Sequence, residues 1–217
     1  MESSPMSLRL YLLRHGETPY SRSGSFCGAL DPDLTPEGQQ MAEAFAAAYA
    51  GIPWQALYVS PMRRTLATLR PLAEKTGLEM QIREGLREIH YGDWEGKTHA
   101  EAREAYPEAY WRWMTEPAWN APPGGETAVQ MANRALPVVA EIEAQWSDGN
   151  VLIVSHKATI RILLCSLLGI DLGRYRDRIE VLAASVSVVK FDRYGPLLES
   201  LGERSYLPPE LRERAGT

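Results

Sequence analysis

The feature that most constrains the fold is an alternation of short apolar runs with longer segments of helical periodicity. The apolar runs are bounded by glycine, proline or polar residues, as buried strands are, and they occupy residues 8–14, 56–59, 80–82, 151–154 and 185–191. Strands that alternate with helices predict an α/β domain. We expect a three-layer α/β/α fold with a mostly parallel central sheet.

The helical segments carry start and stop signals. Thr35 and Pro36 suit the N-cap and first turn of one helix, and Ser60-Pro61 is expected to cap a second helix that Gly77 ends. Residues 98–116 are rich in aromatic and charged side chains, and they predict short helices packed as a cap. Two further helices are expected, one following residue 128 and one that Gly169 ends.

Length and composition favour a single globular domain. The chain has 217 residues, 45% of them hydrophobic and 24% charged, with no internal repeat and no linker-like segment. We therefore expect one domain over 1–217, with a core at about 8–202, a cap region at 98–125 and a polar tail at 203–217.

Charge and cysteine content exclude several classes of partner. The 23 basic and 28 acidic residues give a net charge of −5, which argues against a nucleic acid or a membrane surface as a partner. Cys27 and Cys165 are far apart and predict neither a disulfide framework nor a zinc site. The apolar run at residues 8–13 is too short for a signal peptide or a spanning helix, so we expect a cytoplasmic protein.

Chemistry is expected where the strands end. In open α/β sheets ligands bind outside the carboxyl ends of the strands, which selects Arg14-His15, Ser60 and Ser155-His156. One histidine alone is more often structural than functional, but two at matching strand ends weaken that interpretation. An arginine at the end of an apolar strand is costly unless it is paired or faces an anion, so an anion-binding pocket is predicted.

These residues form part of a longer ordered pattern. Its segments are Arg14-His15-Gly16-Glu17-Thr18, Gly28 with Asp31, Leu34-Thr35 and Gly38, Ser60-Pro61-Met62-Arg63-Arg64 with Thr68, Leu86-Arg87-Glu88-Ile89 with residues 91–96, Gly124-Gly125-Glu126-Thr127 and Ser155-His156. The pattern resembles the histidine phosphatase superfamily, in its phosphoglycerate-mutase-like branch, and most of all its broad-specificity phosphatases. The resemblance implies a phosphoglycerate-mutase-like fold.

The resemblance also implies a catalytic set for hydrolysis of small phosphate monoesters. His15 is the expected nucleophile and forms a phosphohistidine, while Arg14 and Arg64 hold the phosphate with bidentate hydrogen bonds. The nearby guanidinium groups are expected to keep His15 neutral. His156 is expected to bind the transferring phosphoryl group. Glu88 is expected to protonate the leaving group and then to take a proton from water.

Weaker candidates for phosphate or substrate contact are Thr18, Ser21, Cys27, Gly28 and the backbone amide of Lys157. Ser21 stands where the family often has asparagine, and Lys157 stands where glycines are frequent. Trp111 and Trp113 are expected to serve packing.

The remaining histidines, His90 and His99, are expected beside the substrate and on the surface, respectively. A metal is not expected, because the acidic and histidine residues lack ligand spacing and converging arginines would repel a cation. We also expect no cofactor.

Two alternatives stay open, a bisphosphoglycerate-dependent phosphoglycerate mutase and a non-catalytic phospho-ligand-binding module. The segment between Gly96 and Gly124 is short and holds only Lys97, Arg103 and Arg112 as basic residues, which favours the phosphatase. The expected partner is a small phosphorylated metabolite, and a homodimer is left open.

Overall fold

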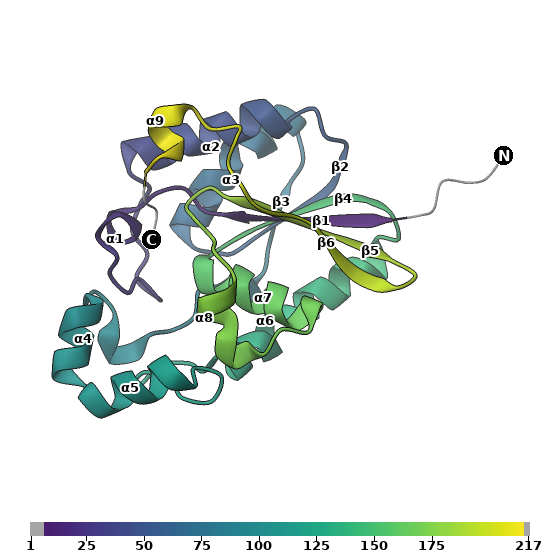
Figure 1. The fold of residues 1–217 in the computed structure, drawn as a ribbon. Helices are drawn as coiled ribbons and strands as arrows, with labels where there is room; N and C mark the ends of the chain where they lie inside the picture. The colour runs from purple at the N-terminus through teal and green to yellow at the C-terminus, as the bar shows by residue number, and fades with distance from the viewer. Residues whose placement is uncertain (1–6, 215–217) are drawn as a thin grey trace.

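A six-stranded sheet forms the centre of the computed structural model, which describes residues 7–214 (Figure 1). The strand order is β3-β2-β4-β1-β5-β6. The strands are β1 (Leu8–Arg14), β2 (Trp54–Val59), β3 (Met80–Ile82), β4 (Gly149–Ser155), β5 (Val186–Asp192) and β6 (Gly195–Glu203). The expected strands are all present, and β6 is an addition.

The strand directions bring the predicted motifs to one edge. β1 runs parallel to β4, β4 to β2, and β2 to β3, whereas β5 and β6 are antiparallel. Arg14, the last residue of β1, lies in register with Ser155, the last residue of β4. The sheet is therefore mostly parallel, as predicted, and the segments that follow β1, β2 and β4 meet outside its carboxyl edge.

Helices cover both faces of the sheet (Figure 1). α2 (Pro36–Tyr49) and α3 (Arg63–Thr76) pack on one face, where Phe45 and Leu69 are buried against Leu57 and Val154. α6 (Ala128–Gln145) and α7 (Lys157–Leu168) pack on the other face. The expected three layers are thus confirmed. The remaining helices are α1 (Pro19–Ser23), α4 (His99–Ala105), α5 (Pro107–Thr115), α8 (Tyr175–Arg178) and α9 (Pro209–Arg212), with 3-10 turns at Glu84–Leu86, Gly92–Trp94 and Leu172–Arg174.

The helix ends follow the predicted signals except at one position. The Thr35 side chain accepts a hydrogen bond from the Gly38 amide at the start of α2, and Gly77 ends α3 with a φ of 72°. The prediction that Ser60-Pro61 caps α3 is wrong, because α3 begins at Arg63 and its N-cap residue, Met62, makes no side-chain cap. The Ser60 hydroxyl instead lies 2.8 Å from Nε2 of His156.

The cap has a small aromatic core of its own. Phe26, Trp94, Tyr110 and Trp113 are buried together beside α4 and α5, which extend away from the sheet at the lower left of Figure 1. Ring centroids of Trp94 and Trp113 lie 5.2 Å apart at an interplanar angle of 89°, the edge-to-face geometry that aromatic pairs favour. The short helices expected in this region are confirmed.

The end of the chain is more ordered than the polar tail that we expected at 203–217. Glu203 ends β6, and the buried side chains of Leu207 and Leu211 pack against Met41 of α2. Residues 215–217 of this tail, like the polar residues 1–6, lie outside the described residues. No helix in the described part of the chain is long and apolar enough to cross a membrane.

Candidate active site

A cavity of about 470 Å³ opens outside the carboxyl edge of the sheet. Nine of the ten predicted site residues line it: Arg14, His15, Thr18, Ser21, Cys27, Gly28, Arg64, Glu88 and Lys157. The tenth, His156, packs against His15 with ring centroids 5.2 Å apart. The structure therefore brings together residues that span more than 140 positions of the sequence.

His15 directly follows β1, and its backbone continues the sheet by donating to the Ser155 carbonyl. Its Nδ1 lies 2.7 Å from the carbonyl oxygen of Gly16, which can only accept, so Nδ1 carries the proton. Burial and the charges of Arg64 and Arg14 hold the pKa of His15 well below its usual range. The ring is consequently neutral, and Nε2 holds a lone pair.

Arg64 reaches the cavity from the first turn of α3 and is completely buried. Its guanidinium donates to the backbone carbonyls of Leu30 at 2.7 Å and of Gly28 at 3.2 Å. The nearest carboxylate is that of Asp31, at 3.6 Å. Because neutral carbonyls supply most of its hydrogen bonds, the positive charge of Arg64 is available to an anion in the cavity.

Arg14 is the second buried guanidinium of the cavity. It donates to the Val181 carbonyl at 2.8 Å, and burial lowers its pKa to about 10. It therefore remains charged at neutral pH. The two guanidiniums together give the cavity its affinity for a dianion.

Both ring nitrogens of His156 have protein partners. Arg64 Nε lies 3.2 Å from Nδ1 and can only donate, so this nitrogen is unprotonated. In the neutral ring the proton is then on Nε2, which donates to the Ser60 hydroxyl. Burial and the Arg64 charge hold the pKa of His156 well below its usual range. These contacts fix the ring orientation beside His15.

Glu88 approaches the cavity from the opposite face of the sheet. Its carboxylate accepts from its neighbour's amide, Ile89, at 3.0 Å, and from the amides of Ala158 and Thr159 at 3.4 and 3.3 Å. The carboxylate thus lies over the first turn of α7, where the helix dipole favours a negative charge. This position suits a group that exchanges a proton with a ligand in the cavity.

The weaker candidates have structural partners as well as a place on the cavity wall. Thr18 and Ser21 form a reciprocal capping box at the start of α1. Burial raises the pKa of Cys27 to about 11, so its thiol is protonated at neutral pH. Gly28 has a φ of 51°, and a side chain there would collide with the carboxylate of Glu95. Burial, with Arg14 and Arg161 adding repulsion, lowers the pKa of Lys157 to about 7.

Sequence reasoning missed a second group of lining residues. These are Tyr91, Arg161, Tyr175 and Arg176. One signal was available, since Arg161 follows Lys157 by four residues and therefore lies on the same face of the helix. Tyr175 and Arg176 come from a segment that no motif marks.

The structure also shows where the two remaining histidines and the tryptophans of the cap lie relative to the cavity. His99 is exposed, as expected, yet it lines the cavity and stacks 4.4 Å from Phe26. Trp113 is buried in the aromatic core and also reaches the cavity, whereas Trp111 is 58% exposed. His90, which we expected beside the substrate, lies outside this cavity and contacts the Gly124 carbonyl.

The family model of the histidine phosphatase superfamily (branch 1) matches residues 10–204, which include every residue of the cavity wall. The chain belongs to this superfamily. The Arg14-His15-Gly16 segment at the end of β1 lies within the matched range.

Two curated relatives and one solved structure define the branch. The chain is 33% identical over 168 residues to phosphoserine phosphatase 1 of Hydrogenobacter thermophilus, covering 77% of this chain and 80% of the relative. It is 38% identical over 174 residues to glucosyl-3-phosphoglycerate phosphatase of Mycolicibacterium vanbaalenii, covering 77% of each chain. The structure of a mycobacterial glucosyl-3-phosphoglycerate phosphatase superposes with a TM-score of 0.83 at 31% identity, over 91% of this chain and 100% of that one. The chain is a phosphatase, an enzyme that hydrolyses phosphate monoesters.

Proposed function

We propose that the chain hydrolyses small phosphorylated metabolites through a phosphohistidine on Nε2 of His15, with Glu88 as the acid and base. The observation that carries this proposal is the state of His15, which is neutral, has Nδ1 held by the Gly16 carbonyl, and lies in a cavity with two buried guanidiniums. Such a nitrogen is a nucleophile aimed at a bound dianion.

In the first step Nε2 of His15 attacks phosphorus, and the bond from phosphorus to the ester oxygen breaks. Arg14 and Arg64 hold the non-bridging oxygens and neutralise their charge, which is the main stabilisation that phosphoryl transfer requires. Glu88 gives its proton to the departing oxygen, so the alcohol leaves uncharged. His156 lies beside His15, and its ring nitrogens, which bond to Arg64 and Ser60, orient the Arg64 guanidinium that holds the transferring group.

In the second step water attacks the phosphohistidine. Glu88, now a carboxylate, takes a proton from this water as its oxygen bonds to phosphorus. The bond from phosphorus to Nε2 breaks, inorganic phosphate forms, and neutral His15 is restored. No step of this cycle calls for a metal or a cofactor.

The proposal also covers the domain organisation, the cellular compartment and the oligomeric state. Residues 98–125 cover one side of the cavity through Trp113 and belong with the sheet to one domain. The two cysteines, Cys27 and Cys165, are unpaired, which supports a cytoplasmic enzyme. A homodimer stays open.

The test is phosphate release from a panel of sugar phosphates, phosphoglycerates, phosphoserine and a nitrophenyl ester. We expect turnover of several of these that is insensitive to chelators. Isomerisation of 3-phosphoglycerate that outpaces phosphate release in the presence of a bisphosphoglycerate primer would identify a mutase. Binding without release from any ester would identify a non-catalytic module.

A further inference from the structure

We propose that the cavity contains a second anion subsite, formed by Arg161, Arg176 and Tyr175 with Lys157 at its edge, which binds a carboxylate on the organic part of the substrate. This subsite rests on the proposed function, because it specifies which phosphate monoesters the enzyme prefers. It lies on α7 and α8, apart from the two arginines that hold the phosphate.

Positive side chains outnumber negative ones on the cavity wall. Five cationic side chains line it, Arg14, Arg64, Lys157, Arg161 and Arg176, against the single carboxylate of Glu88. The phosphate uses the first two. Within residues 7–214, no carboxylate lies within ion-pairing distance of the other three. Three cations without a protein counter-ion leave this side of the cavity suited to a further negative group.

Two of these cations share one face of α7. Lys157 and Arg161 are four residues apart, a spacing at which like charges destabilise a helix. Both side chains are partly buried, and Nε of Arg161 is buried without a hydrogen-bond partner among the described residues. A carboxylate between them would remove the repulsion and supply the missing acceptor.

α8 adds a neutral donor and an oriented cation. Tyr175 is 1% exposed, and its hydroxyl borders the cavity beside the Tyr91 side chain without a close hydrogen bond among the described residues. The guanidinium of Arg176 lies 3.6 Å from the ring centroid of Trp113. This stacking fixes the guanidinium plane without cancelling its charge. A buried hydroxyl without a close hydrogen bond is costly, and a bound anion would provide one.

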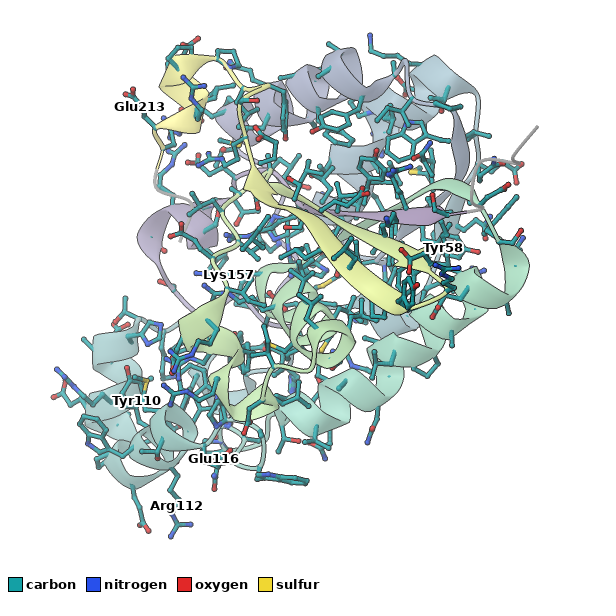
Figure 2. All side chains as sticks on the ribbon, turned by 45° about the vertical axis from the view of Figure 1, so that its right-hand side comes forward. Tyr58, Tyr110, Arg112, Glu116, Lys157 and Glu213 are labelled. Carbon is teal, nitrogen blue, oxygen red and sulfur yellow. The ribbon has the colours of Figure 1, made fainter. Side chains whose placement is uncertain are left out.

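The position of Glu88 places the subsite on the leaving-group side. The ester oxygen must reach the Glu88 carboxylate, which lies over the first turn of α7, so the organic group extends along the helix that carries Lys157 and Arg161. Figure 2 shows Lys157 between the end of the sheet and the cap that carries Tyr110. The pKa of Lys157 is lowered mainly by burial and further by repulsion from Arg14 and Arg161, and a bound carboxylate would oppose this shift.

The test compares esters that differ only in the carboxylate. One pair is 3-phosphoglycerate and glycerol 3-phosphate, and the other is phosphoserine and phosphoethanolamine. A charge-assisted contact is expected to raise kcat/KM about tenfold or more for the first member of each pair. Equal values within each pair would overturn the subsite, and so would a stronger preference for a second phosphate, shown with a sugar bisphosphate against its monophosphate.

Substitutions of the subsite arginines test which residues cause the carboxylate preference. Arg161→Gln and Arg176→Gln should each lower kcat/KM about tenfold more for the carboxylate ester than for its partner, mainly through KM, and Arg161→Lys should restore part of the loss. The matched control is Arg174→Gln, an exposed arginine beside Tyr175 that pairs with Asp177 outside the cavity and should change neither value. Equal losses on both esters would show that Arg161 and Arg176 are only structural.

A binding measurement separates this inference from the proposed function. Calorimetric titration of His15→Ala with both members of a pair should give a tighter Kd for the carboxylate ester, and Arg161→Gln in that background should abolish the difference. If the carboxylate preference appears in binding while the wild type releases no phosphate, the proposed function fails and the subsite stands. If the wild type releases phosphate but shows no carboxylate preference, the proposed function stands and the subsite fails.

Discussion

The carbonyl of Gly16 lies 2.7 Å from Nδ1 of His15 and holds the ring proton there, so in the proposed mechanism Nε2 is the attacking atom. We predict that rapid acid-free quenching traps a phosphohistidine whose phosphorus is bonded to Nε2. We also predict that His15→Ala lowers kcat by about 10⁴-fold or more, as the loss of a nucleophile does elsewhere. His90→Ala, outside the cavity, is the control and should retain activity. An adduct on Nδ1, or appreciable turnover by His15→Ala, would refute the assignment.

The protonation state of the histidines predicts the acid side of the pH profile. Burial and Arg64 lower the pKa values of both His15 and His156, so each ring stays neutral when the pH falls through 6.5, the ordinary value. The kcat/KM for a nitrophenyl ester, whose phosphate ionises at lower pH than that of an alkyl ester, should therefore hold level across this range. A decline with a midpoint near 6.5 would show that the nucleophile is an ordinary, solvated imidazole.

Glu88 predicts a dependence on the leaving group. Glu88→Gln can keep the contacts of Oε1 with the Ile89 and Thr159 amides through its amide oxygen, loses the acceptor for the Ala158 amide, and has no proton to transfer. For alkyl esters kcat should fall by about 10²- to 10⁴-fold, and for the nitrophenyl ester, whose alcohol leaves without a proton, much less. Glu84→Gln, an exposed carboxylate outside the cavity, is the control. Equal losses on both esters would assign Glu88 a structural role.

At the scale of elements, the start of α2 packs backbone to backbone on the catalytic loop. A side chain at Gly38 would collide with the backbone of Glu17, two residues after His15. Gly38→Ala should therefore destabilise the fold by about 1–3 kcal/mol and lower kcat, since the loop must move. In Gly51→Ala, just after the same helix, the new methyl group meets nothing within 4 Å, so its Tm and kcat should match the wild type. Equal behaviour of the two variants would contradict this packing.

The elements also differ in how far the sequence predicts them. β1 and β4 are central strands, so they are continuous apolar runs, and α2 begins at a recognisable cap. β6 was not predicted, because it is an edge strand whose residues are only partly buried or exposed and it begins with Gly195-Pro196. The Ser60 cap was wrong because a local pattern does not reveal the distant histidine that binds its hydroxyl.

The same limit applies to the candidate site. His15, Arg64 and His156 follow strands or begin helices within recognisable motifs, so the sequence places them. Tyr175 and Arg176 reach the cavity only because α8 packs beside α7 and because Trp113 of the cap lies under the guanidinium. Such three-dimensional neighbours have no fixed spacing in the sequence.

At the scale of the whole molecule, the C-terminal end of the described chain packs against the segment that follows His15. α9 lies beside α2 (Figure 1), and the chain then brings Arg214 to Glu17 with an Nε to Oε2 distance of 2.9 Å. Arg22 and Thr35 also donate to the Glu17 carboxylate. Residues 197 positions apart thus hold the loop that follows His15 and Gly16.

The contacts of the Glu17 carboxylate with Arg214, Arg22 and Thr35 predict that the stability of the fold depends on pH. Burial alone would raise the pKa of Glu17, but hydrogen bonds from Arg214, Arg22 and Thr35 outweigh it and lower the pKa from 4.5 to about 2. Because the folded value lies below the unfolded one, the stabilisation is complete above pH 4.5 and is lost as the pH falls toward 2.

Arg214→Ala should therefore lower the free energy of unfolding at pH 7, but only in part, since Arg22 and Thr35 remain on the carboxylate. Chemical denaturation of both proteins from pH 7 to 3 should show this difference shrinking with acidity. In a Glu17→Gln background the Arg214 substitution should cost little, because the charge that it pairs with is gone. Arg212→Ala, an exposed arginine two residues earlier at the end of α9, supplies the control. A loss that is the same at pH 7 and pH 3, or that persists without the Glu17 charge, would mean that Arg214 stabilises the fold through packing and not through its ion pair with Glu17.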